Sequence, residues 1–271
     1  MLIDLHTHTT ASDGLLAPAA LVQAAHAAGI ELLAITDHDA IDAYATLPAP
    51  PPGLTLVGGI ELSTAYNGSG VHVVGLNLAL HSDALAQALA TQREARSARA
   101  ERIAERLHKR GIAGALAGAA RHADTAAIGR PHFAAYLVEI GACVDAEAAF
   151  RKYLARDLAP AAAWPPLPTI VGWIRDAGGV AVLAHPGKYG LTRKRLDELT
   201  GAFRAAGGEA LEVVSGLQRP DVTRDLASLA ERHGLALSAG SDFHQPGQAW
   251  AALGRLAPLP VTGRRVWELW Q

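Results

Sequence analysis

The stretch LIDLHTHTTASDGLLAPAALVQAAHAAGIELLAITDHD, residues 2–39, contains the unit from which the fold can be predicted. An apolar run at 2–6 is typical of a buried strand, a helical pattern follows at 18–28, and a second apolar run lies at 32–36. Gly29 stands directly after the helical pattern, where helices commonly end on a left-handed residue. Strand, helix and strand in this order predict a βα unit of a parallel sheet that is buried on both faces.

The same order recurs in the rest of the chain. Further apolar runs lie at 54–60, 71–76, 180–184, 210–214 and 235–239, and helical patterns that end at glycine lie at 169–177, 195–206 and 221–233. The number of these units predicts an α/β fold in which the strands form a barrel.

One long segment interrupts this rhythm. Residues 82–110 form an Ala- and Arg-rich helical pattern, and from 111 to about 167 we expect helical or irregular structure without a clear strand. We therefore expect residues 1–80 and 168–271 to form the barrel. Residues 81–167 are expected to be a helical insertion that covers one end of the barrel as a substrate cap.

Composition narrows the functional classes. The 271 residues are 50% hydrophobic and 18% charged, and the formal net charge of −2 is too balanced for binding long nucleic acid by bulk electrostatics. The apolar runs are shorter than a bilayer-spanning helix, and the N-terminal stretch lacks the pattern of a signal peptide, so we expect a cytoplasmic protein without membrane contact. The single cysteine, Cys143, excludes an intrachain disulfide and is expected to be a small buried hydrophobe.

Histidines and carboxylates stand at the ends of the predicted strands. His6 and His8 alternate along the first strand, so both imidazoles lie on one face and can bind the same metal ion. His72 lies inside the strand at 71–76 and points inward if that strand turns back beside the third. We expect these side chains to converge, because the C-terminal ends of barrel strands form the face on which barrel enzymes build their sites. The candidate metal ligands are His6, His8, Asp13, His38, Glu61, His72, His185, Asp242 and His244.

These candidates offer six imidazoles and three carboxylates. One tetrahedral ion needs fewer ligands, so the set predicts two or three divalent ions that share bridging carboxylates. Mn²⁺ is the first choice, with Fe²⁺ or Zn²⁺ as alternatives, because a Ca²⁺ site would need more oxygen ligands.

Six motifs in register resemble those of a known family. DLHTHT, TDHD, GIEL, VHVVGL, LAHPG and GSDFH, in this order, are similar to the motifs of the polymerase and histidinol phosphatase (PHP) family. The resemblance spans almost the whole chain and implies a metal-dependent phosphoesterase on a distorted seven-stranded, TIM-like βα barrel. It also implies a division of the ligands among three ions: His6, His8, Glu61 and Asp242 around the first, Glu61, His72 and His185 around the second, and Asp13, His38 and His244 around the third.

Three further segments are similar to one subgroup of this family: GRPHF at 129–133, REARSARAERI at 93–103 and FRKYL at 150–154. Members of that subgroup dephosphorylate 3′,5′-nucleoside bisphosphates, and close relatives trim short RNA from the 5′ end. Without the resemblance, arginines at every third position would indicate a solvated basic face. With it, the expected substrate ligands are Arg96, Arg99, Arg130 and His132. The chain departs from the subgroup at 156–167, where relatives carry Gly-Tyr-Val after FRKYL.

These features together predict an enzyme that hydrolyses a phosphate monoester of a small nucleotide. A 3′,5′-nucleoside bisphosphate is the first candidate and the 5′ end of a short oligonucleotide is the second. We expect a hydroxide that bridges two ions to attack phosphorus. The residues expected nearest the reaction are Asp13, His38, Glu61 and His244. Two alternatives remain open: a histidinol-phosphate phosphatase, and a non-catalytic PHP module that binds metal or assists a polymerase.

Overall fold

The strands form a nearly closed barrel in a computed structural model that describes residues 1–124, 126–154 and 164–270. The sheet follows chain order, with strands β1 (Ile3–Asp4), β2 (Leu32–Ile35), β3 (Thr55–Tyr66), β4 (Ser69–Leu76), β5 (Val180–Leu183), β6 (Ala210–Ser215) and β7 (Ala236–Gly240). Beside β1 and β7, the Leu5 N–H donates to the Ala239 carbonyl, and Thr7 pairs with Phe243. The predicted fold, a distorted seven-stranded α/β barrel, is confirmed.

The distortion lies at β3, β4 and β5. β3 pairs antiparallel with β4, and β4 pairs antiparallel with β5, whereas the other neighbouring strands in the sheet are parallel. β3 reaches Tyr66, beyond the predicted end at residue 60, because its second half pairs with β4. Asn67 and Gly68 both have positive φ in the turn, as a tight hairpin connection requires. The strand that contains His72 therefore does turn back beside the third strand.

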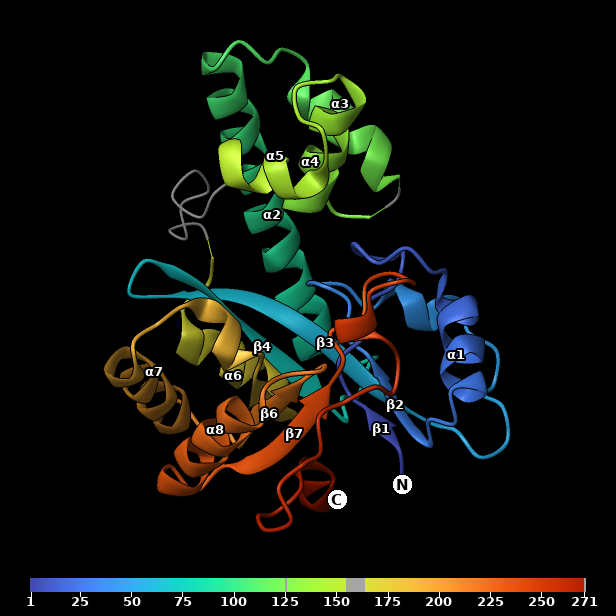
Figure 1. Cartoon of the computed structure of the whole chain (residues 1–271), viewed down its shortest axis with the longest axis vertical. Coiled ribbons are helices and arrows are strands. Elements are labelled where there is room, and N and C mark those ends of the chain that lie inside the picture. Colours follow the sequence, from blue (N-terminus) through green and yellow to red (C-terminus); the bar gives the residue numbers. More distant parts are fainter. Residues whose placement is uncertain (125, 155–163, 271) are drawn as a thin grey trace.

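Helices cover the outside of the barrel (Figure 1). They are α1 (Pro18–Ala27), α6 (Leu167–Asp176), α7 (Arg193–Ala205) and α8 (Pro220–Arg232). Each lies within two residues of its prediction, and each presents an apolar stripe to the sheet; α8, for example, buries Leu226, Leu229 and Ala230. α7 begins at Arg193, two residues earlier than predicted, because the Thr192 hydroxyl caps its first turn.

Four helices stand above the barrel: α2 (Asp83–Lys109), α3 (Ala115–Ala123), α4 (Arg130–Glu139) and α5 (Ala146–Lys152). α2 begins at the barrel, where Leu85 and Leu89 join the barrel core. Its far half carries Ile103 and Leu107 into a second core with α3, α4 and α5, which surround it in Figure 1. One continuous helix thus belongs to two apolar cores.

Short 3-10 helices lie at Asp42–Thr46, Pro186–Tyr189, Ala249–Ala251 and Val266–Leu269. Among the described residues, no helix combines the length and the apolar composition that crossing a bilayer would require.

Candidate metal centre

The candidate ligands meet at one end of the barrel. His6 and His8 follow β1, His38 follows β2, Glu61 lies in β3 and His72 in β4. His72 pairs with Ser63, two residues from Glu61, so the three side chains share one face of the hairpin. His185 follows β5, while Asp242 and His244 follow β7.

The backbone is strained where several strands end. Asp39, His185 and Asp242 have φ angles of 53°, 26° and 56°, in the left-handed region that residues other than glycine rarely adopt. They lie shortly after β2, β5 and β7. Conformations of this kind persist where the surrounding structure fixes them, and they concentrate at functional sites.

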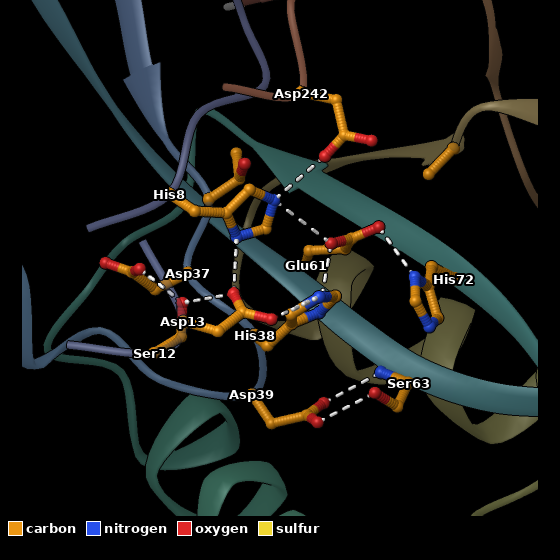
Figure 2. Close-up of polar contacts among 12 residues, drawn as sticks. His8, Ser12, Asp13, Asp37, His38, Asp39, Glu61, Ser63, His72 and Asp242 are labelled. Atoms are coloured by element: carbon orange, nitrogen blue, oxygen red, sulfur yellow. Dashed lines mark hydrogen bonds and ion pairs between the residues drawn. The ribbon is translucent and has the colours of Figure 1, made fainter. Parts of the chain in front are cut away.

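Glu61 is the centre of the cluster. Its carboxylate is fully buried. Oε1 lies 2.9 Å from both His72 Nδ1 and His185 Nε2. Oε2 lies 3.0 Å from His38 Nδ1, 3.3 Å from His6 Nε2 and 3.4 Å from His8 Nε2. One carboxylate therefore touches five imidazoles, as Figure 2 shows for His8, His38 and His72.

Two further carboxylates complete the set. Asp242 Oδ1 lies 3.5 Å from His6 Nε2 and 3.3 Å from His8 Nε2. Asp13 Oδ1 lies 3.4 Å from His244 Nε2, and its Oδ2 lies 3.8 Å from His38 Nε2. The donor atoms of three overlapping groups lie within 4.8 Å of one another: His8, Asp13, His38 and His244; His6, His8 and Glu61; and His38, Glu61 and His72.

The donor set fits divalent metal ions. Several of its buried atoms have no hydrogen-bond partner among residues 1–124, 126–154 and 164–270: His6 Nε2, both ring nitrogens of His8, His38 Nδ1 and Glu61 Oε2. Buried polar atoms are nearly always bonded, so this group of unsatisfied nitrogen and oxygen atoms requires another partner. Mixed imidazole and carboxylate donors suit Mn²⁺, Fe²⁺ and Zn²⁺.

The electrostatics favour the ligand forms of Glu61, His8 and His72, whereas at His6, His38 and His244 nearby carboxylates outweigh burial and raise the pKa. Burial opposes ionisation of Glu61, but His38 and His72 outweigh it and hold the pKa of this carboxyl well below its usual range. Burial also disfavours imidazolium, and it lowers the pKa of His8 to about 3 and that of His72 to about 4. Metals bind ionised carboxylates and neutral imidazoles, which are the forms that this environment stabilises at these three residues.

Glu212 is a supporting residue that the sequence analysis missed. Its buried Oε2 lies 2.9 Å from His6 Nδ1 and accepts a hydrogen bond from the His185 backbone N–H at 2.8 Å. A proton on Nδ1, which this contact favours, leaves His6 Nε2 as the ligand atom facing Glu61. A carboxylate inside the apolar run ALEVV was the available signal.

Asp37 and Asp39, which flank His38, fix neighbouring segments. Asp37 accepts hydrogen bonds from the Thr9 N–H and from the hydroxyls of Thr9 and Ser12, which holds the loop that carries Asp13. Asp39 accepts from the N–H and hydroxyl of Ser63 at 2.7 and 2.8 Å (Figure 2).

A cavity of about 300 Å³ opens beside the cluster. Its wall includes Asp13, His38, His72, His185 and His244 from the barrel, and Arg96, Arg99, Arg130, Phe150, Trp164 and Lys188. Lys188, which the sequence analysis did not select, lies with its Nζ 2.6 Å from Asp242 Oδ2. Five of the nine metal-ligand candidates and three of the four expected substrate ligands therefore line one cavity.

The expected substrate ligands differ in their surroundings. Arg96 Nε donates to Asp39 at 2.6 Å. Arg99 Nε is buried and has no hydrogen-bond partner among the residues that the structure describes. Burial together with Arg130 and Arg96 lowers the pKa of Arg99 to about 9. His132 is not among the cavity-lining residues in the described part of the chain; its Nδ1 accepts the Gly129 N–H and caps α4.

Arg93, on the same helix, is exposed and pairs with Asp42 at 3.7 Å. The departure from the subgroup at 156–167 lies largely in residues 155–163, which are outside the described residues.

Comparisons with known proteins agree with this geometry. A PHP domain model matches residues 4–103. The whole chain is 43% identical to the 5′-3′ exoribonuclease Rnm of Escherichia coli (strain K12), of which it covers 94%. It is 41% identical to the 3′,5′-nucleoside bisphosphate phosphatase of Chromobacterium violaceum, over 98% of this chain and 95% of that protein. A solved structure of an amidohydrolase from Chromobacterium violaceum, with bound sulfate and no metal, has a TM-score of 0.89 and 40% identity over 99% of this chain and 95% of that one.

Proposed function

The chain belongs to the PHP family of phosphoesterases, and from this premise we propose that it hydrolyses a phosphate monoester of a small nucleotide. A 3′,5′-nucleoside bisphosphate is the first candidate substrate, and the 5′ end of a short RNA is the second. Relatives with these two activities in their names are 41% and 43% identical to this chain over nearly its whole length. A cytoplasmic location is part of the proposal.

One observation carries the proposal. Five metal-ligand candidates line a cavity whose wall also includes Arg96, Arg99 and Arg130. Metal ligands and guanidinium groups around one cavity suit a substrate with two phosphates. The bound sulfate of the Chromobacterium violaceum structure, an anion similar to phosphate, supports the same class of ligand.

We assign two or three divalent ions to the centre, Mn²⁺ first and Fe²⁺ or Zn²⁺ as alternatives. The proposed ligand groups are His6, His8, Glu61 and Asp242; Glu61, His72 and His185; and Asp13, His38 and His244. When bound, such ions lower the pKa of a water molecule and neutralise charge on phosphate oxygens. The buried Glu61 carboxylate supplies negative charge between neighbouring groups, which reduces the repulsion between cations.

The other proposed roles belong to the protein side chains. Asp13, His38, Glu61 and His244 surround the phosphate that is cleaved. Arg99 and Arg130 bind the second phosphate through charge-assisted hydrogen bonds, and Arg96 adds positive charge while Asp39 holds it. His132 acts on the substrate only indirectly, because it fixes the first turn of α4 next to Arg130.

The division of the chain is also a proposal. Residues 1–80 and 168–271 form the barrel, and residues 81–167 form the cap that selects the substrate. Arg96 and Arg99 lie on α2 and Arg130 on α4, so the arginines come from this segment. The ligand candidates come from the barrel.

A substrate panel with metal analysis tests the function. Purified protein should contain two or three divalent ions and should hydrolyse adenosine 3′,5′-bisphosphate, or a short 5′-phosphorylated RNA, with a kcat/KM well above that for histidinol phosphate. The reverse order would identify a histidinol-phosphate phosphatase instead. Full metal content without turnover of any phosphate ester would favour a non-catalytic module.

A further inference from the structure

Trp164 contacts two of the arginines that line the cavity. It stands shortly before α6 and lines the same cavity as Arg96 and Arg99. The Cζ atom of Arg99 lies 5.4 Å from the centroid of the Trp164 ring, and that of Arg96 lies 5.7 Å from it. One indole therefore contacts two guanidinium groups.

Arg96 and Arg99 differ in their polar partners. Arg96 is bonded to Asp39, whereas Arg99 Nε has no hydrogen-bond partner in the described part of the chain and lies near the charges of Arg96 and Arg130. Repulsion between the arginines would drive the Arg99 side chain toward solvent unless another contact held it. Among the described residues, the aromatic face of Trp164 is the contact recorded for its guanidinium.

An aromatic face holds a cation differently from a carboxylate. A carboxylate attracts guanidinium by accepting its N–H groups, and these donors are then unavailable to a substrate. The face of an indole attracts the cation through the ring quadrupole and leaves the N–H groups at the edge of the guanidinium plane available. The same arrangement recurs at Arg130, whose Cζ lies 5.7 Å from the ring of Phe150.

We propose that Trp164 is a positioning residue, whose indole face holds the Arg99 guanidinium in the cavity with its N–H groups directed to the second phosphate of the substrate. This inference rests on the proposed function. Trp164 thereby determines how strongly the enzyme prefers a bisphosphate over a substrate with a single phosphate.

The test compares Trp164→Leu, which keeps apolar bulk without an aromatic face, with Trp164→Phe, which keeps the face. The measured quantity is the ratio of kcat/KM for adenosine 3′,5′-bisphosphate to that for 4-nitrophenyl phosphate. A cation–π contact in a partly desolvated site predicts that Trp164→Leu lowers this ratio about tenfold, mainly through KM, and that Trp164→Phe restores most of it. Trp250→Leu is the matched control, because Trp250 is 63% exposed, and it should leave the ratio unchanged.

A second readout does not depend on catalysis. In zinc-loaded protein, which is diamagnetic, the Arg99 Nε–H resonance can be assigned from its loss in Arg99→Lys. The ring current of Trp164 should shift this resonance upfield, and the shift should vanish in Trp164→Leu and persist in Trp164→Phe.

The two readouts separate this inference from the proposed function. If wild-type enzyme shows no preference for the bisphosphate, the proposed substrate is wrong, and the resonance alone decides whether Trp164 holds Arg99. If the preference exists and Trp164→Leu retains it, the role of Trp164 is refuted. Equal losses in the Leu and Phe variants would also refute it, since the aromatic face would then not matter.

Discussion

Replacement of Glu61 by glutamine tests the centre most directly. The change keeps the size of the side chain and one carbonyl oxygen, but it removes the charge and converts the other oxygen into an NH₂ group. If the amide oxygen takes the place of Oε1, the NH₂ group faces His6, His8 and His38, whose contacts with Oε2 are 3.0–3.4 Å long. These nitrogens would then meet a donor where they now meet an anion.

The magnitude follows from the number of contacts. Loss of one charge-assisted contact to each of the two ions that Glu61 is proposed to bind, at about 1.5–3 kcal/mol each, amounts to about 3–6 kcal/mol. Since about 1.4 kcal/mol corresponds to a factor of ten, kcat/KM should fall by a factor on the order of 10²–10⁴. Metal content should fall as well, because Glu61 is proposed to bind two ions.

The assay combines turnover of adenosine 3′,5′-bisphosphate with elemental analysis of the purified variant. Circular dichroism shows whether the variant is folded, and Glu198→Gln, at an exposed carboxylate on α7, is the control. A folded Glu61→Gln protein with full metal content and a rate within a few-fold of wild type would refute the bridging role.

Three further predictions address the ligands, their support and the arginines. The double variant His6→Ala/His8→Ala should lose most activity and metal, because two ligands of one ion disappear; unchanged metal stoichiometry by elemental analysis would contradict the assignment. Glu212→Gln should weaken metal binding about 10–100-fold in competition with a chelator, because a neutral amide oxygen replaces the carboxylate oxygen that accepts from His6 and the His185 backbone. Glu209→Gln, three residues earlier, is the control and should not weaken it. Arg99→Lys or Arg130→Lys should lower the ratio of kcat/KM for the bisphosphate to that for 4-nitrophenyl phosphate by a factor on the order of 10–100, because lysine cannot make two parallel hydrogen bonds to phosphate. Arg93→Lys is the control on the same helix, and a ratio that stays constant in all three lysine variants would return Arg99 and Arg130 to a structural role.

Local sequence patterns predicted the barrel because its strands are continuous apolar runs between glycine-terminated helices. They also predicted where the candidate ligands converge, since His6, His8 and Asp242 follow strand ends closely. The antiparallel course of β4 was predicted only conditionally: His72 was expected to point inward if its strand turned back beside the third strand. Its cause, a two-residue turn at Asn67 and Gly68, is local, but the pairing of β4 with β5 is a long-range contact that periodicity does not report.

The missed residues share one property: their roles come from contacts between distant segments. Glu212 lies 206 residues from His6, and Lys188 lies 54 residues from Asp242. Trp164 lies within the segment 156–167, where the chain departs from the related subgroup, so its position next to Arg99 had no local signal. A motif indicates the residues that bind metal or substrate, whereas the residues that position them are identified from distances in the structure.

The course of α2 through two cores has a consequence for the range of substrates. Leu85 and Leu89 fix its first turns in the barrel, Ile103 and Leu107 fix its far half in the upper core, and Arg99 lies between these anchors. A helix that is held at both ends fixes the spacing and direction of the side chains between its anchors, since it advances about 1.5 Å and turns about 100° with each residue. If Arg99 binds the second phosphate as proposed, the separation between the two phosphates of an accepted molecule is set by the number of residues along α2. A single alanine inserted between Leu89 and Arg96 would rotate the far half of α2 relative to the barrel and change the phosphate separation that the site accepts.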